Sequence, residues 1–197
     1  GFVVLLFVHE MGQVIALRRE GIRASLPMFI PFLGAVISAR SLGENATAEA
    51  RVGSAGPILG SVGAGLCLVI WQITGDDYWR ALAFAGLFLN LFNLLPVLPL
   101  DGGRAMAAMA PWMWGVGFAA MVVLALVFPN PVIFIIVLFA GFETHRRWKL
   151  RRTRSLEQAA YYRVSPRDRW LIAAVYLGLI ALLVVGMDAT HLQRTLG

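Results

Sequence analysis

The sequence predicts an all-α polytopic membrane protein with about six transmembrane helices. Hydrophobic residues fill 59% of the 197 positions and charged residues only 14%, whereas about a quarter of the residues in an average soluble protein are charged. Charges and prolines separate apolar runs near residues 2–17, 52–74, 81–95, 112–128, 132–142 and 170–187. We expect residues 1–197 to form a single membrane-embedded domain. Because the chain opens with Gly inside an apolar run, we also expect it to be truncated at its N-terminus.

The basic residues lie in the connections where the positive-inside rule would place them. They concentrate in residues 18–51, at Arg104 and in residues 146–169, whereas Asp76 and Asp77 occupy a connection between these regions. Because cytoplasmic loops are enriched in Lys and Arg, this pattern predicts a multi-pass protein of a cell membrane, which we expect to be bacterial. The net charge of +6 then reflects topology and contact with the lipid bilayer. No nucleic acid is expected as a partner.

The first apolar run carries two polar residues, His9 and Glu10, near its centre. An acidic residue at the centre of a transmembrane helix costs about 2.5–3.5 kcal/mol on insertion scales. Arg18 lies too far along the helix to neutralise Glu10, at a distance of about 12 Å. Such a residue is a candidate for function, and the alternative is a polar pair that hydrogen-bonds to neighbouring helices.

The spacing of His9 and Gln13 is that of the two metal-ligating histidines in an HExxH motif. Residues one helical turn apart share a face, and Glu10, rotated by about 100°, is able to reach a water molecule beside the metal. This chain reads HEMGQ, so Gln13 stands at the second-histidine position. An amide oxygen is a weaker zinc ligand than a neutral imidazole. The motif therefore predicts a metal site with reduced affinity.

A second polar element follows the third apolar run, in FLNLFNLLPVLPLDGGR at residues 88–104. Prolines break this helix just before Asp101, and broken backbone at membrane depth has to line protein or a cavity. Asp101 has two interpretations that do not exclude each other. It caps the short helix that follows, or it supplies a third hard ligand to a catalytic zinc.

HEMGQ, the segment SAGPILG at residues 54–60 and the LDGGR element together resemble the site-2 protease family of membrane metalloproteases. The resemblance covers residues 9–104, about half of the chain. It implies that His9 and Asp101 bind Zn²⁺, that Gln13 occupies a ligand position, and that Glu10 is the catalytic base that activates water. Two amides, Asn90 and Asn93, are candidates for binding the substrate carbonyl, and hydrogen bonding between helices is the alternative for both.

The connection between the first two apolar runs is apolar but contains Pro27, Pro31 and Gly34, so it is poorly suited to a spanning helix. The resemblance implies a short membrane-reentrant β-hairpin here. An edge strand would give hydrogen-bond partners to the backbone of an unwound substrate. A loop at the membrane interface is the alternative.

The function predicted from the resemblance is that of an intramembrane zinc metalloendopeptidase. It would hydrolyse peptide bonds of transmembrane protein substrates near the cytoplasmic side, toward which the active site would face. Three interpretations of Gln13 remain open: an active variant with a weak ligand, an inactivated form that retains its substrate, and a catalytically dead homologue that acts as a membrane-protein adaptor or chaperone.

Overall fold

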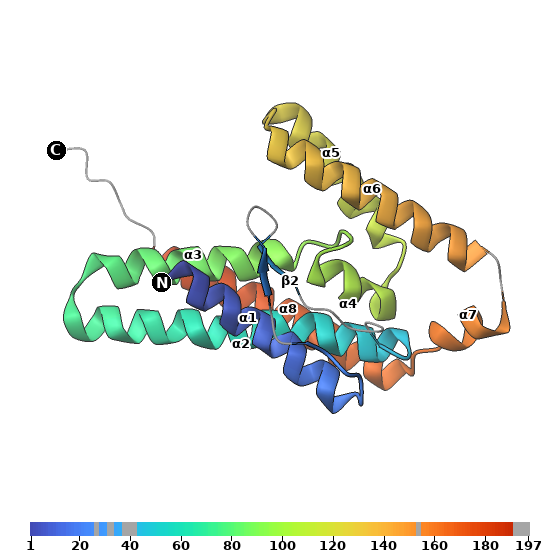
Figure 1. The fold of residues 1–197 in the computed structure, drawn as a ribbon, viewed down its shortest axis with the longest axis horizontal. Coiled ribbons are helices and arrows are strands. Elements are labelled where there is room, and N and C mark those ends of the chain that lie inside the picture. The colour runs from blue at the N-terminus through green and yellow to red at the C-terminus, as the bar shows by residue number, and fades with distance from the viewer. Residues whose placement is uncertain (26–27, 31–33, 37–42, 153–154, 191–197) are drawn as a thin grey trace.

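The computed structural model describes residues 1–25, 28–30, 34–36, 43–152 and 155–190. In these residues the chain is helical apart from two short strands (Figure 1). The elements are α1 (Phe2–Arg19), β1 (Met28–Ile30), β2 (Gly34–Val36), α2 (Ala46–Thr74), α3 (Asp77–Asn93), α4 (Asp101–Met109), α5 (Met113–Val127), α6 (Pro131–Arg152), α7 (Leu156–Tyr161) and α8 (Pro166–Thr190). The prediction of an essentially helical chain is confirmed.

Each predicted apolar run lies within or closely overlaps one helix, but several helices continue past their runs. The second run starts at residue 52, whereas α2 starts at Ala46, because the Asn45 side chain caps the helix by accepting a 2.9 Å hydrogen bond from the Ala48 amide. The run at 132–142 continues to Arg152 in α6. Arg and Lys are good helix formers, so hydropathy marks the apolar part of a helix and not its ends.

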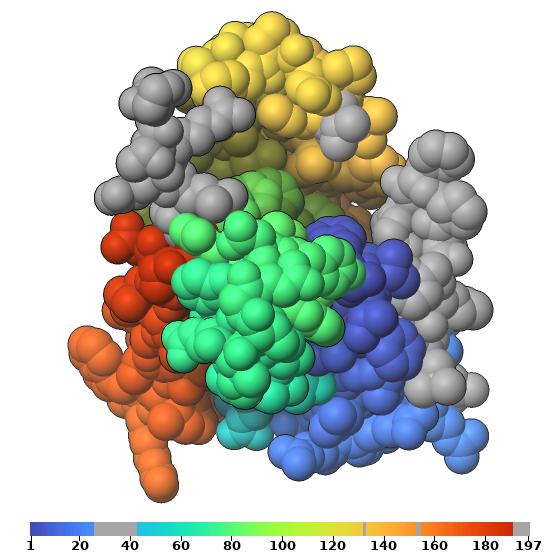
Figure 2. Space-filling model, turned by 90° about the vertical axis from the view of Figure 1, so that its left-hand side faces the viewer, coloured from blue at the N-terminus to red at the C-terminus, as the bar shows by residue number. Residues whose placement is uncertain are grey.

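Helix α2 occupies the centre of the molecule, where it contacts α1, α3, α4 and α8. Viewed from the end at which α2 turns into α3, these two helices lie between α1 and α8 (Figure 2). Small residues allow the close packing. A Cβ atom at Gly12 of α1 would lie 2.3 Å from the Ala55 carbonyl oxygen of α2, so only glycine permits this approach of the two backbones.

The segment that joins α3 to α4 folds back as an irregular bend, as Pro96 and Pro99 predict. The bend is held from two sides. The Trp114 indole N–H donates a 2.6 Å hydrogen bond to the Gly103 carbonyl, and the Tyr176 hydroxyl of α8 donates to the Leu94 carbonyl. Backbone groups freed by the break therefore find partners, and Asp101 is fixed at the first turn of α4.

Helices α5 and α6 form a hairpin that leans away from the other helices (Figure 1). Its main packing is between the two helices themselves, with further contacts from α5 to α4. On the side of the hairpin that faces the bend, Val97 of the bend packs with Met121 of α5 and Ala140 of α6. The hairpin is thus joined to the core through α4 and the bend, and a second link to α2 lies near the end of α6.

Among the described residues, two helices are long and apolar enough to cross a membrane, α2 and α8. The shorter α5 is also apolar. Membrane spanning by the remaining predicted segments stays a prediction. In the segment for which a hairpin is expected, β1 and β2 pair antiparallel, with Phe29 opposite Ala35. Whether this pair enters the bilayer stays a prediction as well, and Pro27 and Pro31 lie outside the described residues.

Candidate active site

Three of the residues singled out in the sequence meet in the interior of the protein. His9 and Gln13 come from α1, and Asp101 comes from the start of α4. The His9 Nε2 atom lies 3.0 Å from Asp101 Oδ2, and the Gln13 amide nitrogen donates to both oxygens of Asp101, at 2.9 and 3.1 Å. The three residues are only 1%, 7% and 4% exposed, respectively. The fold therefore builds one buried polar cluster from two distant sequence elements.

Asn90 of α3 orients the His9 ring. Its amide nitrogen donates a 2.7 Å hydrogen bond to the Gly86 carbonyl, which turns its oxygen toward His9 Nδ1 at 2.8 Å. An oxygen at this position accepts a hydrogen bond from Nδ1–H and leaves Nε2 directed at Asp101. The structure thus places Asn90 in hydrogen bonds between helices, the alternative that its sequence position allows.

Two glycines of the SAGPILG segment make room for this arrangement. A Cβ atom at Gly56 would lie 2.7 Å from His9 Nε2, and one at Gly60 would lie 2.2 Å from Asn90 Oδ1. Side chains at either position would displace the groups that set the His9 ring. The small residues of this segment therefore serve the site directly, because they leave room for the side chains of His9 and Asn90.

Glu10 and Asn93 border the cluster and are less enclosed. Both are half-buried. Within the described residues the Glu10 carboxylate accepts no hydrogen bond, although it lies close enough to Asp101 and Arg104 to interact with their charges. The Asn93 amide nitrogen donates to the Leu89 carbonyl at 3.1 Å. An amide nitrogen carries two N–H groups, and the second one makes Asn93 the candidate of the two amides for donating a hydrogen bond to a substrate carbonyl.

Arg104 completes the cluster and is absent from the set of residues predicted from sequence. It lies one turn beyond Asp101 on α4, where its Nη1 donates a 3.0 Å hydrogen bond to Gln13 Oε1 and lies 3.5 Å from Asp101 Oδ1. The oxygen of Gln13 therefore faces Arg104, and its NH₂ group faces Asp101 and His9. The LDGGR motif contains Arg104, but sequence alone gave no reason to connect it with Gln13.

The chemistry of the cluster fits zinc at two positions. An imidazole nitrogen and a carboxylate are ordinary zinc ligands, and those of His9 and Asp101 converge. Among the described residues, however, no group of three or more His, Cys, Asp or Glu is arranged to hold a metal. Gln13 stands where a third ligand would be, but it directs its NH₂ group toward Asp101, and an N–H group does not coordinate a metal ion. His145 does not complete the set, since it is exposed on α6.

A second buried polar cluster joins the start of α2 to α6 and α7. Glu49 is fully buried and accepts hydrogen bonds from both terminal nitrogens of Arg147 and from the Tyr161 hydroxyl. Burial and the Glu49 charge raise the pKa of Tyr161, so its hydroxyl stays protonated and donates. No feature of the sequence identified these residues as partners, because Arg147 lies 98 positions from Glu49.

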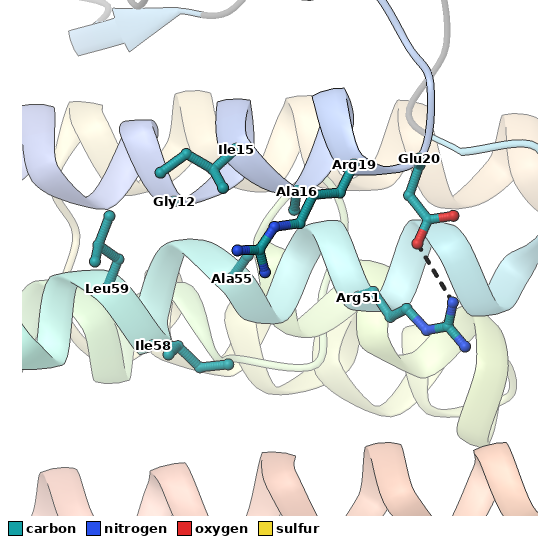
Figure 3. A pocket seen from close by; sticks show the side chains of 9 residues that line it. All are labelled: Gly12, Ile15, Ala16, Arg19, Glu20, Arg51, Ala55, Ile58 and Leu59. Carbon is teal, nitrogen blue, oxygen red and sulfur yellow. Dashed lines mark hydrogen bonds and ion pairs between the residues drawn. The ribbon is translucent and has the colours of Figure 1, made fainter.

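A groove on a neighbouring face of α1 is separate from the polar cluster (Figure 3). It has a volume of about 400 Å³ and lies between α1 and α2. Apolar side chains such as Ile15, Ile58 and Leu59 line it, and Arg19 and the Arg51–Glu20 pair border it. No residue of the polar cluster lines this groove, so it is not the candidate active site.

Comparison with known proteins gives two matches. Peptidase family M50 matches residues 70–137, which include Asp101 but not His9. A zinc metalloprotease of Methanocaldococcus jannaschii is 29% identical over 121 residues, covering 57% of this chain and 35% of the relative. The chain thus spans about a third of the length of that relative. Both matches support the predicted resemblance to the site-2 protease family of metalloproteases, and the residues matched by the family model contain the LDGGR element but neither HEMGQ nor SAGPILG.

Proposed function

We propose that this chain is an intramembrane zinc metalloendopeptidase that hydrolyses transmembrane protein substrates near the cytoplasmic side. The observation that carries the proposal is the buried convergence of His9 and Asp101, with 3.0 Å between Nε2 and Oδ2. The matches to proteases support hydrolysis as the reaction. They do not favour the alternative of a catalytically dead adaptor or chaperone.

Placement in a bilayer is supported by the exposed apolar surface. Of the most apolar 18-residue stretch of α8, only 17% is buried inside the protein. Side chains such as Leu177, Leu182 and Val185 are mostly exposed. Long apolar helices with lipid-facing side chains are typical of membrane proteins. We therefore propose that these helices lie in a lipid bilayer.

The orientation toward the cytoplasm is supported by the positions of the helix ends. Arg51 of α2 lies 3.4 Å from Glu20, just after α1, and 3.7 Å from Asp168 of α8. These three ends are thus neighbours, opposite the turn that carries Asp76 and Asp77 (Figure 1). The basic end corresponds to the cytoplasmic side of a bacterial cell membrane under the positive-inside rule.

The residues of the cluster have separate roles in the proposed reaction. When bound, a zinc ion held by His9 Nε2 and the Asp101 carboxylate would polarise the scissile carbonyl and activate water. Asn90 holds the Nδ1 proton of His9 and thereby keeps Nε2 available. Glu10 removes a proton from the attacking water and then protonates the leaving amine nitrogen. Burial strengthens each of these electrostatic interactions.

Substrate binding is proposed to involve the strand pair and Asn93. A transmembrane helix has to unwind before its peptide bonds are accessible, and an exposed strand edge offers main-chain hydrogen bonds to the unwound segment. Asn93 lies on the same helix as Asn90, one turn closer to the bend, where it would contact a substrate carbonyl.

Cleavage in liposomes tests the proposed function. The chain is reconstituted with zinc and a single-span substrate, and the cleavage position is mapped by mass spectrometry. We expect slow cleavage in the cytoplasmic part of the transmembrane segment and its loss in Glu10→Gln, which is nearly isosteric. Equal cleavage by Glu10→Gln, or cleavage confined to the opposite side, would contradict the assignment.

A further inference from the structure

The orientation of the Gln13 side chain is determined at both of its ends. Its oxygen accepts from Arg104 Nη1 at 3.0 Å, and its nitrogen donates to Asp101 Oδ1 and Oδ2 at 2.9 and 3.1 Å. The same nitrogen lies 3.4 Å from His9 Nε2. Every polar atom of this amide therefore has a partner inside the protein.

The reverse orientation of the amide is unfavourable for chemical reasons. A guanidinium carries only donors and keeps its charge, and a carboxylate only accepts. Turning the amide over would place NH₂ against Arg104 and the oxygen against Asp101. The hydrogen bonds on both sides of the amide would be lost in a buried site, where unpaired polar groups are costly. The charges on each side thus select one orientation.

The backbone around Arg104 is shaped for this contact. The Arg104 side chain is 17% exposed and that of Asp101 is 4% exposed. On the facing helix, a Cβ atom at Gly53 would lie 2.9 Å from both Arg104 Cβ and the Asp101 carbonyl oxygen. Glycine at this position lets α4 approach α2 closely. The aliphatic part of the Arg104 side chain packs against Gly53, and its guanidinium group reaches Gln13.

We propose that Arg104 is a positioning residue that fixes Gln13 as a hydrogen-bond donor to Asp101. In this role Arg104 keeps the only possible ligand atom of Gln13, its amide oxygen, away from the point where His9 and Asp101 converge. The inference rests on the proposed function, because it concerns the same site. It adds that the reduced metal affinity expected of the chain depends on residue 104 as well as on residue 13.

Zinc affinity in a double-mutant cycle tests the proposal without reference to catalysis. Zinc binding to the purified full chain is measured by competition with a chromogenic chelator. Arg104→Met is compared in the given chain and in the Gln13→His background, where no amide remains to be turned. Arg104→Lys serves as a control that keeps the positive charge.

We expect Arg104→Met to raise zinc affinity about tenfold more in the given chain than in the Gln13→His background, a coupling within the range found for contacting residues. Gln13→Glu should also gain affinity, because it keeps an acceptor for Arg104 and replaces the NH₂ group with oxygen. Equal effects of Arg104→Met in both backgrounds would mean that Arg104 acts through its charge alone, and the proposal would fail.

A metal-free measurement separates this proposal from the proposed function. The thermal stabilities of Gln13→Met, Arg104→Met and the double variant are compared in the presence of chelator. Non-additive losses are expected, since either single change breaks the same hydrogen bond. Additive losses would overturn the positioning role. If Gln13→His fails to bind zinc while the losses are non-additive, the proposed function fails and the Arg104–Gln13 coupling stands.

Discussion

The His9 Nδ1 atom lies 2.8 Å from the amide oxygen of Asn90, so a residue of α3 sets the orientation of a ring on α1. Hydrogen bonds of this kind are typical partners of metal-ligating histidines. They determine which ring nitrogen carries the proton and therefore which one is free to bind a metal.

Replacing Asn90 should weaken zinc binding. In the Gln13→His background, where we expect higher zinc affinity, Asn90→Leu should lower that affinity about 10–100-fold, the usual effect of removing the hydrogen-bond partner of a metal-ligating histidine. Asn90→Asp keeps an acceptor for Nδ1–H and should lose less. Isothermal titration calorimetry provides the comparison, and equal affinities for Asn90→Leu and its parent would argue against an orienting role.

Gly60→Ala should destabilise the protein by displacing the same amide. The added Cβ atom would lie 2.2 Å from Asn90 Oδ1, and overpacking of a closely packed interior costs about 1–3 kcal/mol. Gly65→Ala is the matched control on the same helix, because a Cβ atom there meets nothing within 4 Å. The control should be neutral or slightly stabilising. Melting temperatures in detergent measure both, and equal values would contradict the close contact at Gly60.

Arg147→Met should be more destabilising than Arg146→Met. Arg147 neutralises Glu49, which is fully buried, and removing one partner of a buried pair costs about 3–5 kcal/mol. Arg146 forms an exposed pair with Glu143, which contributes about 1 kcal/mol or less. Denaturation of both variants in mixed micelles gives the two free energies of unfolding. Similar losses would mean that the Glu49 cluster does not hold α6 and α7 against α2.

Alkaline pH should weaken the contribution of Tyr161. Burial and the Glu49 charge raise its pKa in the folded protein. A raised folded-state pKa gives stability that is fully present below the unfolded value of about 10 and is lost as the pH rises through the folded value. Tyr161→Phe should therefore show a smaller fall in melting temperature above about pH 10. Identical pH profiles for the two proteins would refute this linkage.

The positions of six of the described helices and three residues of the cluster were predictable from sequence. Apolar runs located these six helices because long apolar segments of this kind form helices, whether in a membrane or in a packed core. Two features marked the two halves of the site: the helical spacing of His9 and Gln13, and the broken segment before Asp101. Both put polar side chains inside apolar segments, where such residues are costly and therefore indicate function.

The contacts within the cluster were not predictable in the same way. Asn90 pairs with His9 because Gly60 leaves a space beside α3, and Arg104 reaches Gln13 because Gly53 brings α4 close to α2. Both depend on how helices distant in sequence pack together. The continuation of α6 to Arg152 was missed for a different reason, since its last two turns are basic and carry no apolar signal.

Zinc content and cleavage of a transmembrane substrate together test whether His9 and Asp101 form a metalloprotease site. The comparison covers the chain as it stands, Gln13→His, and Gln13→His combined with Glu10→Ala. We expect that Gln13→His binds more zinc and cleaves faster, and that adding Glu10→Ala abolishes cleavage while zinc remains bound. If Gln13→His gains neither zinc nor Glu10-dependent cleavage, the cluster of His9 and Asp101 is not a metalloprotease site.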